Sequence, residues 1–396
     1  MPVTAGLAFA AALAWLLASC ASTDQNEGGP RDEGPSEVPD ATVLDGADGG
    51  ADAECSPTDP MCAPPVTCEE AEWCPEPAKV SGLYALTAIW GSSKDDVWAS
   101  GSGGTVIHWD GAAWTPTLLP TESGVPLKNT FHALWGSGPN DVWVASTTNL
   151  IFHTDGFANG TATWTQQPGV ASTPVPLYAA WGSSADDLRF GGRPFYYSDP
   201  DVGLIVANQL VSRRAKGNVE WAPASGRAVV HGIWGSSPDD VWLIADNRAS
   251  VAWQSALTLH GTRQKGELVW TEVDSRASAV LRGIWGSSAS DVWIVGDQGT
   301  IRRLGANGDD WSVVESPTTE TLHAVWGSSA DDVWVVGESG AIFHWDGAAW
   351  TPSVAALANA HTKPNLYGIW GSGPDDVWIV GEGLVLRYTG KTGGSK

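Results

Sequence analysis

The sequence predicts an all-β protein, a seven-bladed β-propeller of four-stranded blades whose ring is closed by an N-terminal strand. The composition supports this prediction, because 47 Gly, 25 Pro and 24 Trp in 396 residues favour turns and strands over helices. A repeat supports it further, since the motif Trp-Gly-Ser occurs seven times with spacings of 41 to 53 residues, a period typical of propellers and solenoids. The copies begin at Trp90, Trp135, Trp181, Trp234, Trp285, Trp326 and Trp370.

Each copy has the pattern of one blade. In the clearest copy, from Leu322 to Thr351, four short runs of β-branched and aromatic residues alternate with Gly, Asp and Ser turns. A second Trp follows the first by eight residues and indicates a hairpin of the first two strands, with Arg189 in its place in the third copy. In the other copies it is Trp98, Trp143, Trp242, Trp293, Trp334 and Trp378.

A third Trp position predicts how the ring closes. The seventh copy reaches Lys396 without this Trp, but Trp73 lies 17 residues before Trp90, within the range of 13 to 21 found in the other copies. The N-terminal segment is therefore expected to supply the outer strand of the last blade, which leaves no long free sheet edge. We interpret the whole Trp set as structural. The remaining third-position residues are Trp114, Trp164, Trp221, Trp270, Trp311 and Trp350.

The N-terminus predicts export and a lipid anchor. An apolar run of 14 residues is too short to span a membrane as a helix and ends in Leu17-Ala18-Ser19-Cys20. This pattern resembles the lipobox of bacterial lipoproteins, which implies a signal peptide over residues 1–19 and a diacylated Cys20. Because Ala21 is not the Asp that favours inner-membrane retention, the resemblance implies the outer membrane or cell surface of a Gram-negative bacterium. The alternative is ordinary signal cleavage, with Cys20 incidental.

Two further segments precede the repeats. Residues 20–54 comprise the lipidated cysteine and an acidic linker with little to bury, which we expect to be disordered. Residues 55–80 comprise a Cys-rich collar and the closing strand, and residues 81–396 form the propeller. Four cysteines in an exported chain predict two disulfides with three possible connectivities, and a zinc site is the alternative. These cysteines are Cys55, Cys62, Cys68 and Cys74.

Every copy carries a polar pair where its first strand turns into its second, as at Asp95 and Asp96. A ring of calcium sites is one interpretation. The other is an Asx-turn, in which the carboxylate accepts backbone N–H hydrogen bonds. We favour the Asx-turn because Asn140 and Ser290 replace the first Asp in two copies.

Charge and motifs narrow the function classes. With 45 Asp and Glu against 21 Lys and Arg, the formal net charge of −24 excludes nucleic acids and anionic membrane surfaces bound through bulk charge. The sequence contains no Gly-x-Ser-x-Gly, HExxH, Walker or GxGxxG motif, so we predict no cofactor and favour a non-enzymatic protein. Basic residues gather in the third and fourth copies and at the entry to the fifth, where departure from the repeat indicates either a grafted function or drift in surface loops.

One unit of the repeat also carries a family resemblance. Asp110-Gly111-x-x-Trp114 and Asp346-Gly347-x-x-Trp350 resemble a shortened Asp-box, the turn between the third and fourth strands in BNR-repeat propellers such as sialidases and photosystem II assembly-factor-like proteins. The chain also resembles Trp-rich lipoproteins with WGSSxDDVW repeats. These resemblances cover about residues 70 to 390 and imply the fold. A sialidase-like hydrolase would need an arginine triad, whereas the arginines here are not spread around the ring.

The position three residues before each Trp-Gly-Ser Trp is the candidate ligand site. The first strand of a blade lines the central channel, and the residue after this position is always Ala or Gly, so variable polar side chains are expected around the channel mouth. The candidates are Thr87, His132, Tyr178, His231, Arg282, His323 and Tyr367, together with Arg193. Three of them are histidines, but they belong to blades two, four and six, so we predict no metal site.

The sequence thus predicts an outer-membrane-anchored surface lipoprotein whose propeller is a binding or scaffold module. Its expected partner is a polar, glycan or protein ligand, and we expect a monomer. The alternative is a BNR-type, sialidase-like glycan hydrolase.

Overall fold

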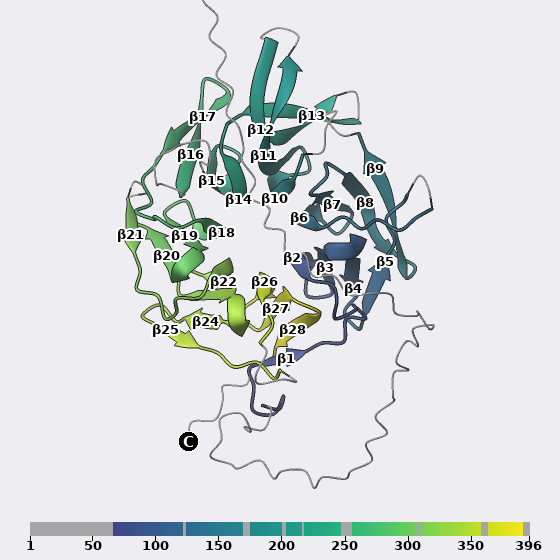
Figure 1. Cartoon of the computed structure of the whole chain (residues 1–396), viewed down its shortest axis with the longest axis vertical. Coiled ribbons are helices and arrows are strands. Elements are labelled where there is room, and N and C mark those ends of the chain that lie inside the picture. Colours follow the sequence, from purple (N-terminus) through teal and green to yellow (C-terminus); the bar gives the residue numbers. More distant parts are fainter. Residues whose placement is uncertain are drawn as a thin grey trace, which may run out of the picture. The chain divides into compact units, whose positions relative to one another are not determined.

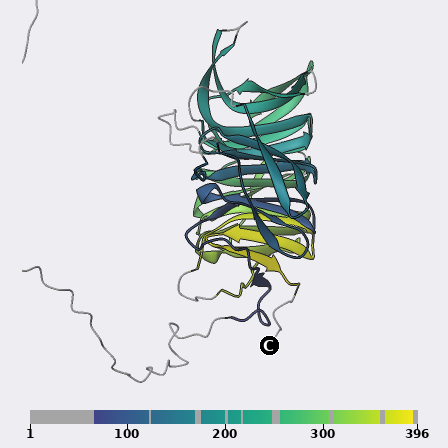
Figure 2. The ribbon, with the colours of Figure 1, turned by 90° about the vertical axis from the view of Figure 1, so that its right-hand side faces the viewer.

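A computed structural model describes residues 66–121, 124–168, 175–199, 203–215, 218–246, 256–305, 308, 310–357 and 363–390. Seven four-stranded antiparallel sheets follow one another around a ring, as the repeat predicts (Figure 1). Figure 2 shows the same ring edge-on, with the blades layered one above another. The prediction of a seven-bladed propeller is confirmed.

Each blade runs from an inner strand, nearest the ring centre, to an outer strand. The inner strands are β2 (Leu86–Ser93), β6 (Phe131–Gly138), β10 (Leu177–Ser184), β14 (Val229–Ser237), β18 (Leu281–Ser288), β22 (Leu322–Ser329) and β26 (Leu366–Gly373). The second strands are β3 (Asp96–Gly101), β7 (Asp141–Ser146), β11 (Asp187–Asp199), β15 (Asp240–Asp246), β19 (Asp291–Gly296), β23 (Asp332–Gly337) and β27 (Asp376–Gly381).

The two peripheral layers complete each blade. The third strands are β4 (Val106–Trp109), β8 (Ile151–Ala158), β12 (Gly203–Ala215), β16 (Leu257–Gln264), β20 (Thr300–Leu304), β24 (Ile342–Trp345) and β28 (Leu384–Tyr388). The outer strands are β5 (Trp114–Thr117), β9 (Thr161–Gln167), β13 (Asn218–Ser225), β17 (Glu267–Glu272), β21 (Trp311–Val313), β25 (Trp350–Pro352) and β1 (Trp73–Pro75). Short 3₁₀ turns link the second and third strands of three blades: η2 (Ser102–Gly104), η3 (Asp297–Gly299) and η4 (Glu338–Gly340).

The ring closes through the N-terminal strand β1. This strand pairs antiparallel with β28, so the seventh sheet has the order β1-β28-β27-β26. Trp73 is fully buried, its ring lies 5.0 Å from that of Trp334, and its indole N–H donates to the hydroxyl of Ser353 at 2.9 Å. The first and last parts of the repeat region are therefore joined within one sheet, as predicted.

The Trp and Gly of each Trp-Gly-Ser motif form the contact between neighbouring blades. A Cβ atom added to Gly136 would lie 2.5 Å from Cη2 of Trp90 in the preceding blade. The same relation closes the circle, because a Cβ on Gly91 would lie 2.6 Å from Trp370 of the last blade. Glycine is thus required at this position because an indole ring packs directly against its Cα.

A second set of Trp contacts holds the blades together farther out. The outer-strand Trp of one blade packs edge-on against the second-strand Trp of the blade before it, as Trp164 does against Trp98 with ring centroids 5.5 Å apart. Such edge-to-face pairs add to the free energy gained from burying the rings. Blade 3 has Arg189 in place of the second-strand Trp, so Trp270 of blade 4 has no indole partner there.

The second Asp of each pair is held by side chains. The Asp96 carboxylate accepts hydrogen bonds from Ser92 (2.5 Å) and the indole N–H of Trp98 (3.2 Å), and it lies 2.7 Å from Nε2 of His108 on β4. The interpretation as an Asx-turn was wrong for this residue, because its partners are side chains of three strand segments. In each of the other blades a His or Arg contacts the corresponding Asp, and it comes from the third strand except in blade 3, where it is Arg189 of the second strand: His153, Arg189, His260, Arg303, His344 and Arg387.

Blade 3 supplies the His or Arg beside its Asp from a different strand. Val211 of β12 stands where the other blades have His or Arg, opposite Arg189 of β11. Arg189 donates to Asp187 at 3.1 Å and so supplies the cation from the position of the missing Trp. β11 and β12 are also the longest strands, 13 residues each, and form the extended hairpin at the top of Figure 1.

Asx-turns do occur, but in the Asp-Gly motifs. The Asp110 carboxylate accepts hydrogen bonds from the backbone N–H groups of Ala112 (3.0 Å) and Ala113 (2.9 Å), and Gly111 has φ +91°. Asp346 makes the same two contacts in blade 6. These turns join the third and fourth strands, as the sequence pattern predicts.

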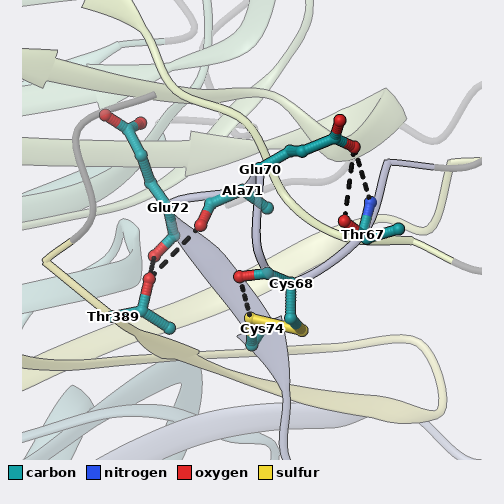
Figure 3. The surroundings of a disulfide bond; sticks show 7 residues. All are labelled: Thr67, Cys68, Glu70, Ala71, Glu72, Cys74 and Thr389. Carbon is teal, nitrogen blue, oxygen red and sulfur yellow. Dashed lines mark hydrogen bonds between the residues drawn. A yellow bond between two sulfur atoms is a disulfide. The ribbon is translucent and has the colours of Figure 1, made fainter. Parts of the chain in front are cut away.

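The collar contains one disulfide within the described residues. Cys68 and Cys74 are bonded, with Cα atoms 5.4 Å apart, so the disulfide joins β1, which contains Cys74, to the segment before it (Figure 3). Close by, the hydroxyl of Thr389 donates to the backbone carbonyls of Ala71 (3.3 Å) and Glu72 (3.0 Å), which ties the C-terminal part of blade 7 to the segment before β1. The predicted signal peptide, Cys20, the acidic linker, Cys55 and Cys62 lie outside the described residues.

Candidate ligand-binding cavity

All seven candidate positions line one cavity of about 580 Å³ at the centre of the ring. One side chain comes from the inner strand of each blade, at its second residue or, in blade 4, its third, because every blade presents the same strand to the channel. Arg193, from the middle of β11, lines the same cavity. The full predicted set is Thr87, His132, Tyr178, His231, Arg282, His323, Tyr367 and Arg193.

A second layer of side chains supports this lining in blades 4 to 7. The Arg282 guanidinium donates to both carboxylate oxygens of Asp297, at 2.7 and 3.0 Å. His231 lies 3.0 Å from the fully buried Asp246. Each supporting acid follows the second-strand Trp of its blade by four residues. The repeat therefore places every acid at the same point behind the lining side chain.

The same pairing continues in blades 6 and 7. Nε2 of His323 lies 3.9 Å from the carboxylate of Glu338, and the Tyr367 hydroxyl donates to Glu382 at 3.0 Å. Partners of this kind restrict the rotamers of the lining side chains before a ligand arrives. Hydrogen bonds to carboxylates therefore hold the lining side chains of blades 4, 5 and 7, and a carboxylate stands near that of blade 6.

Blades 1 to 3 lack such acids, with Ser102, Thr147 and Arg193 at the equivalent positions. Here aromatic contacts connect the lining, because the Tyr178 ring lies 5.9 Å from that of His132 and 6.1 Å from that of His231. The Arg193 side chain is exposed and makes no ion pair among the described residues. The cavity wall is therefore asymmetric, with a carboxylate-supported side and an aromatic side that carries Arg193.

Burial and charge set the protonation of the lining. Burial lowers the pKa of His132, which favours the neutral imidazole. Burial also lowers the pKa of His323, and the Glu338 charge opposes that effect. The hydrogen bonds to Asp297 raise the pKa of Arg282, so its cation is retained. The cavity therefore offers both neutral hydrogen-bonding rings and a fixed positive charge.

An apolar groove of about 540 Å³ adjoins this cavity on blade 1. Tyr84 and Gly103 line the groove, while Ala85 and Ser102, their neighbours in the chain, line the cavity. Leu118 projects at the groove with 86% of its surface exposed, and Leu119 and Leu127 complete its apolar side. An exposed apolar groove beside a polar cavity is a feature of interaction sites.

Among the described residues, no Asp or Glu lines the cavity. Within the described ranges no group of three or more His, Cys, Asp or Glu side chains is arranged to hold a metal ion. Several described arginines of the third to fifth copies pair with separate carboxylates, as Arg263 does with Asp239 and Arg276 with Asp310. Arg213, Arg214 and Lys216 have no described side chains.

The supporting acids were missed in the sequence. Aligning the repeats on their second Trp places Asp246, Asp297, Glu338 and Glu382 in one column, so a signal for them existed. Their role depends on the side chain that each one contacts across the hairpin, and the column alone does not show it. No helix in the described part of the chain is long and apolar enough to cross a membrane.

Comparisons with known structures place this fold among propellers. YCF48 bound to D1 peptide aligns with a TM-score of 0.59 at 18% identity, covering 83% of this chain and 99% of that one. YCF48 from Cyanidioschyzon merolae aligns with a TM-score of 0.60 at 16% identity, covering 81% and 99%. The extracellular domain of the putative hybrid two-component system BT4673 from B. thetaiotaomicron aligns at 0.54 and 10%, covering 80% of this chain and 40% of that chain.

At these identities the likeness shows the fold alone. No protein-family model matches the sequence, and no curated protein matches it either.

Proposed function

We propose that this protein is a binding module that holds a segment of a protein partner at the face where the central cavity opens. The observation that carries the proposal is the cavity itself, in which one repeat position supplies Thr, His, Tyr and Arg side chains around an otherwise constant frame. Convergent polar groups of different kinds on a rigid scaffold are typical of a specific binding site.

Two further observations favour a polypeptide over a glycan. YCF48, which has a similar fold, is known in a structure with a bound peptide. The apolar groove on blade 1 adjoins the polar cavity, so an extended chain has room for a polar segment in the cavity and an apolar side chain beside Leu118. The described lining residues include no carboxylate pair of the kind that glycoside hydrolysis requires.

The test is a selection of peptides from a random display library on the purified protein, followed by affinity measurement on variants. Because Arg282 and His231 present fixed polar groups to the cavity, Arg282→Ala and His231→Ala should each weaken binding about tenfold or more. Arg276→Ala is the matched control, since its guanidinium pairs with Asp310. It should bind as the wild type does.

A glycan array and a panel of fluorogenic glycosides run in parallel. If the protein bound a glycan and no peptide, and this binding depended on Arg282, the partner would be a sugar and not a protein. Turnover of a glycoside that a single Asp or Glu substitution abolishes would contradict the proposal and support the sialidase-like alternative.

We also propose that a lipid on Cys20 holds this module at the outer membrane. The lipobox-like Leu17-Ala18-Ser19-Cys20 and the acidic, Gly- and Pro-rich residues 21–54 support it. A flexible linker of 34 residues would give the propeller a reach of roughly 30 Å from its anchor.

A further inference from the structure

The interface between blades 3 and 4 contains a pocket that the central cavity does not explain. It has a volume of about 190 Å³. On the side of blade 3 it is bounded by β12 and by the connection from β13 to β14, and on the side of blade 4 by β15, β16 and β17. This is also the interface where the second-strand Trp is replaced by Arg189.

Gln209 is the residue that departs furthest from the repeat in this pocket. It pairs with Gly191 across β11 and β12, and the strand registers give its counterpart in each of the other blades. Every counterpart is a buried β-branched residue: Val106, Ile151, Thr258, Ile301, Ile342 and Val385. Blade 3 therefore has a carboxamide at a position that the other six blades use for core packing.

Two buried amide oxygens in this pocket have no hydrogen-bond donor among the described residues. They are Oε1 of Gln209 and Oδ1 of Asn208, and each of these residues is only 2% exposed. The Asn208 amide N–H donates to the carbonyl of Ala228 at 2.7 Å, which fixes the orientation of its carboxamide. Buried acceptors are ordinarily paired, so a molecule that fills the pocket should bring hydrogen-bond donors to them.

The remaining walls define that molecule further. Leu243, Leu259 and Trp270 supply apolar surface, while Ser225 and Arg227 are exposed and offer donors at the pocket mouth. The described residues that line the pocket include no Asp or Glu, so a cationic ligand would lack a counter-charge from them. The matching chemistry is a small uncharged ring with several hydroxyl groups and an apolar C–H face.

We propose that this pocket binds one monosaccharide unit, with its hydroxyl groups donating to Gln209 and Asn208. The volume equals that of about six water molecules, which suits a single sugar ring and not an oligosaccharide. This site is separate from the central cavity and does not depend on the function proposed for it. It assigns a role to the departure of copy three from the repeat.

The experiment measures binding of D-glucose, D-galactose, D-mannose and N-acetyl-D-glucosamine to the full chain by saturation-transfer NMR and titration calorimetry. At least one sugar should bind the wild type, and Gln209→Val, which restores the residue type of the other blades, should weaken that binding tenfold or more. The melting temperature of Gln209→Val should equal or exceed that of the wild type, because an unpaired buried oxygen is removed. Ser100→Ala, at a buried polar position of blade 1, should leave sugar binding unchanged.

Arg227→Ala, at the exposed mouth, provides a second variant that does not disturb the core and should also weaken binding. Absence of binding for all four sugars would overturn the proposal. Wild-type affinity in both Gln209→Val and Arg227→Ala would also overturn it, because the sugar would then occupy another site. A sugar-soaked crystal with ordered water alone in the pocket would have the same consequence.

Discussion

Gly136 illustrates how single residues join the blades. An added Cβ would lie 2.5 Å from Trp90 of the preceding blade and 2.7 Å from the backbone oxygen of Asp141. Gly136→Ala should therefore lower the free energy of unfolding by about 1–3 kcal/mol, as overpacking does elsewhere. Chemical denaturation checks this value.

Gly138 provides the matched control in the same strand. An added Cβ there meets no atom within 4 Å, and most other copies have Ser at this position. Gly138→Ala should unfold like the wild type. Equal destabilisation by both substitutions would mean that backbone freedom, and not the indole contact, decides the effect.

The buried Asp residues predict a sensitivity to acid. Burial acts to raise the pKa of Asp96, but the hydrogen bonds from His108, Ser92 and Trp98 outweigh it and hold this pKa below the ordinary value of an aspartate. The pKa values of Asp141 and Asp332 are lowered by the same kinds of contact. A carboxyl with a lowered folded-state pKa stabilises the fold above its unfolded pKa, and this contribution is lost as the pH falls through the folded value.

The melting temperature should consequently be level near neutral pH and fall steeply below pH of about 4. Asp96→Asn should lower the melting temperature at pH 7 and flatten the acid branch. Asp95→Asn, next to it in the chain but exposed and paired with Lys94, should change neither. Circular dichroism melts between pH 7 and pH 3 measure both effects, and an unchanged acid branch in Asp96→Asn would contradict the assignment.

At the scale of elements, β1 contributes more to the stability of the ring than its length of three residues suggests. Trp73 is fully buried against Trp334, and β1 joins the N-terminal segment to the last blade. Trp73→Ala should cost about 3–5 kcal/mol, as other large core truncations do. It should also release the closing strand, so that limited proteolysis cleaves the chain before residue 80.

Trp164 occupies the same outer position in blade 2, where both neighbouring blades are covalently continuous with it. Trp164→Ala should cost a similar free energy but leave β1 protected from protease. If the two variants show the same cleavage pattern and the same sharpness of unfolding, closure by β1 is not what stabilises the ring.

At the scale of the whole molecule, the propeller is expected to be an anchored module. Cys20→Ala should move the protein from the membrane fraction to the soluble fraction and remove palmitate labelling, because the acylated thiol is lost. Fractionation and radiolabelled palmitate measure the two effects. Labelling that survives the substitution would contradict the lipid anchor.

The sequence by itself determined the blade number, the strand pattern and the closing role of Trp73. These features depend on spacing within one copy, and seven copies with constant Trp offsets leave little freedom in register. It also located the cavity lining, from His132 to Tyr367, because every inner strand of a propeller faces the same channel.

Only the tertiary structure decided which residues meet between strands and between blades. Asp96 bonds to His108, Trp90 packs on Gly136, and Gln209 enters a core layer, yet each partner lies 12 to 46 residues away or in another blade. The supporting acids such as Asp297 are likewise recognised only through the side chains they contact. Pairings within a blade depend on the register of its strands, and pairings between blades depend on the closed ring, so the residue spacing alone does not identify the partners.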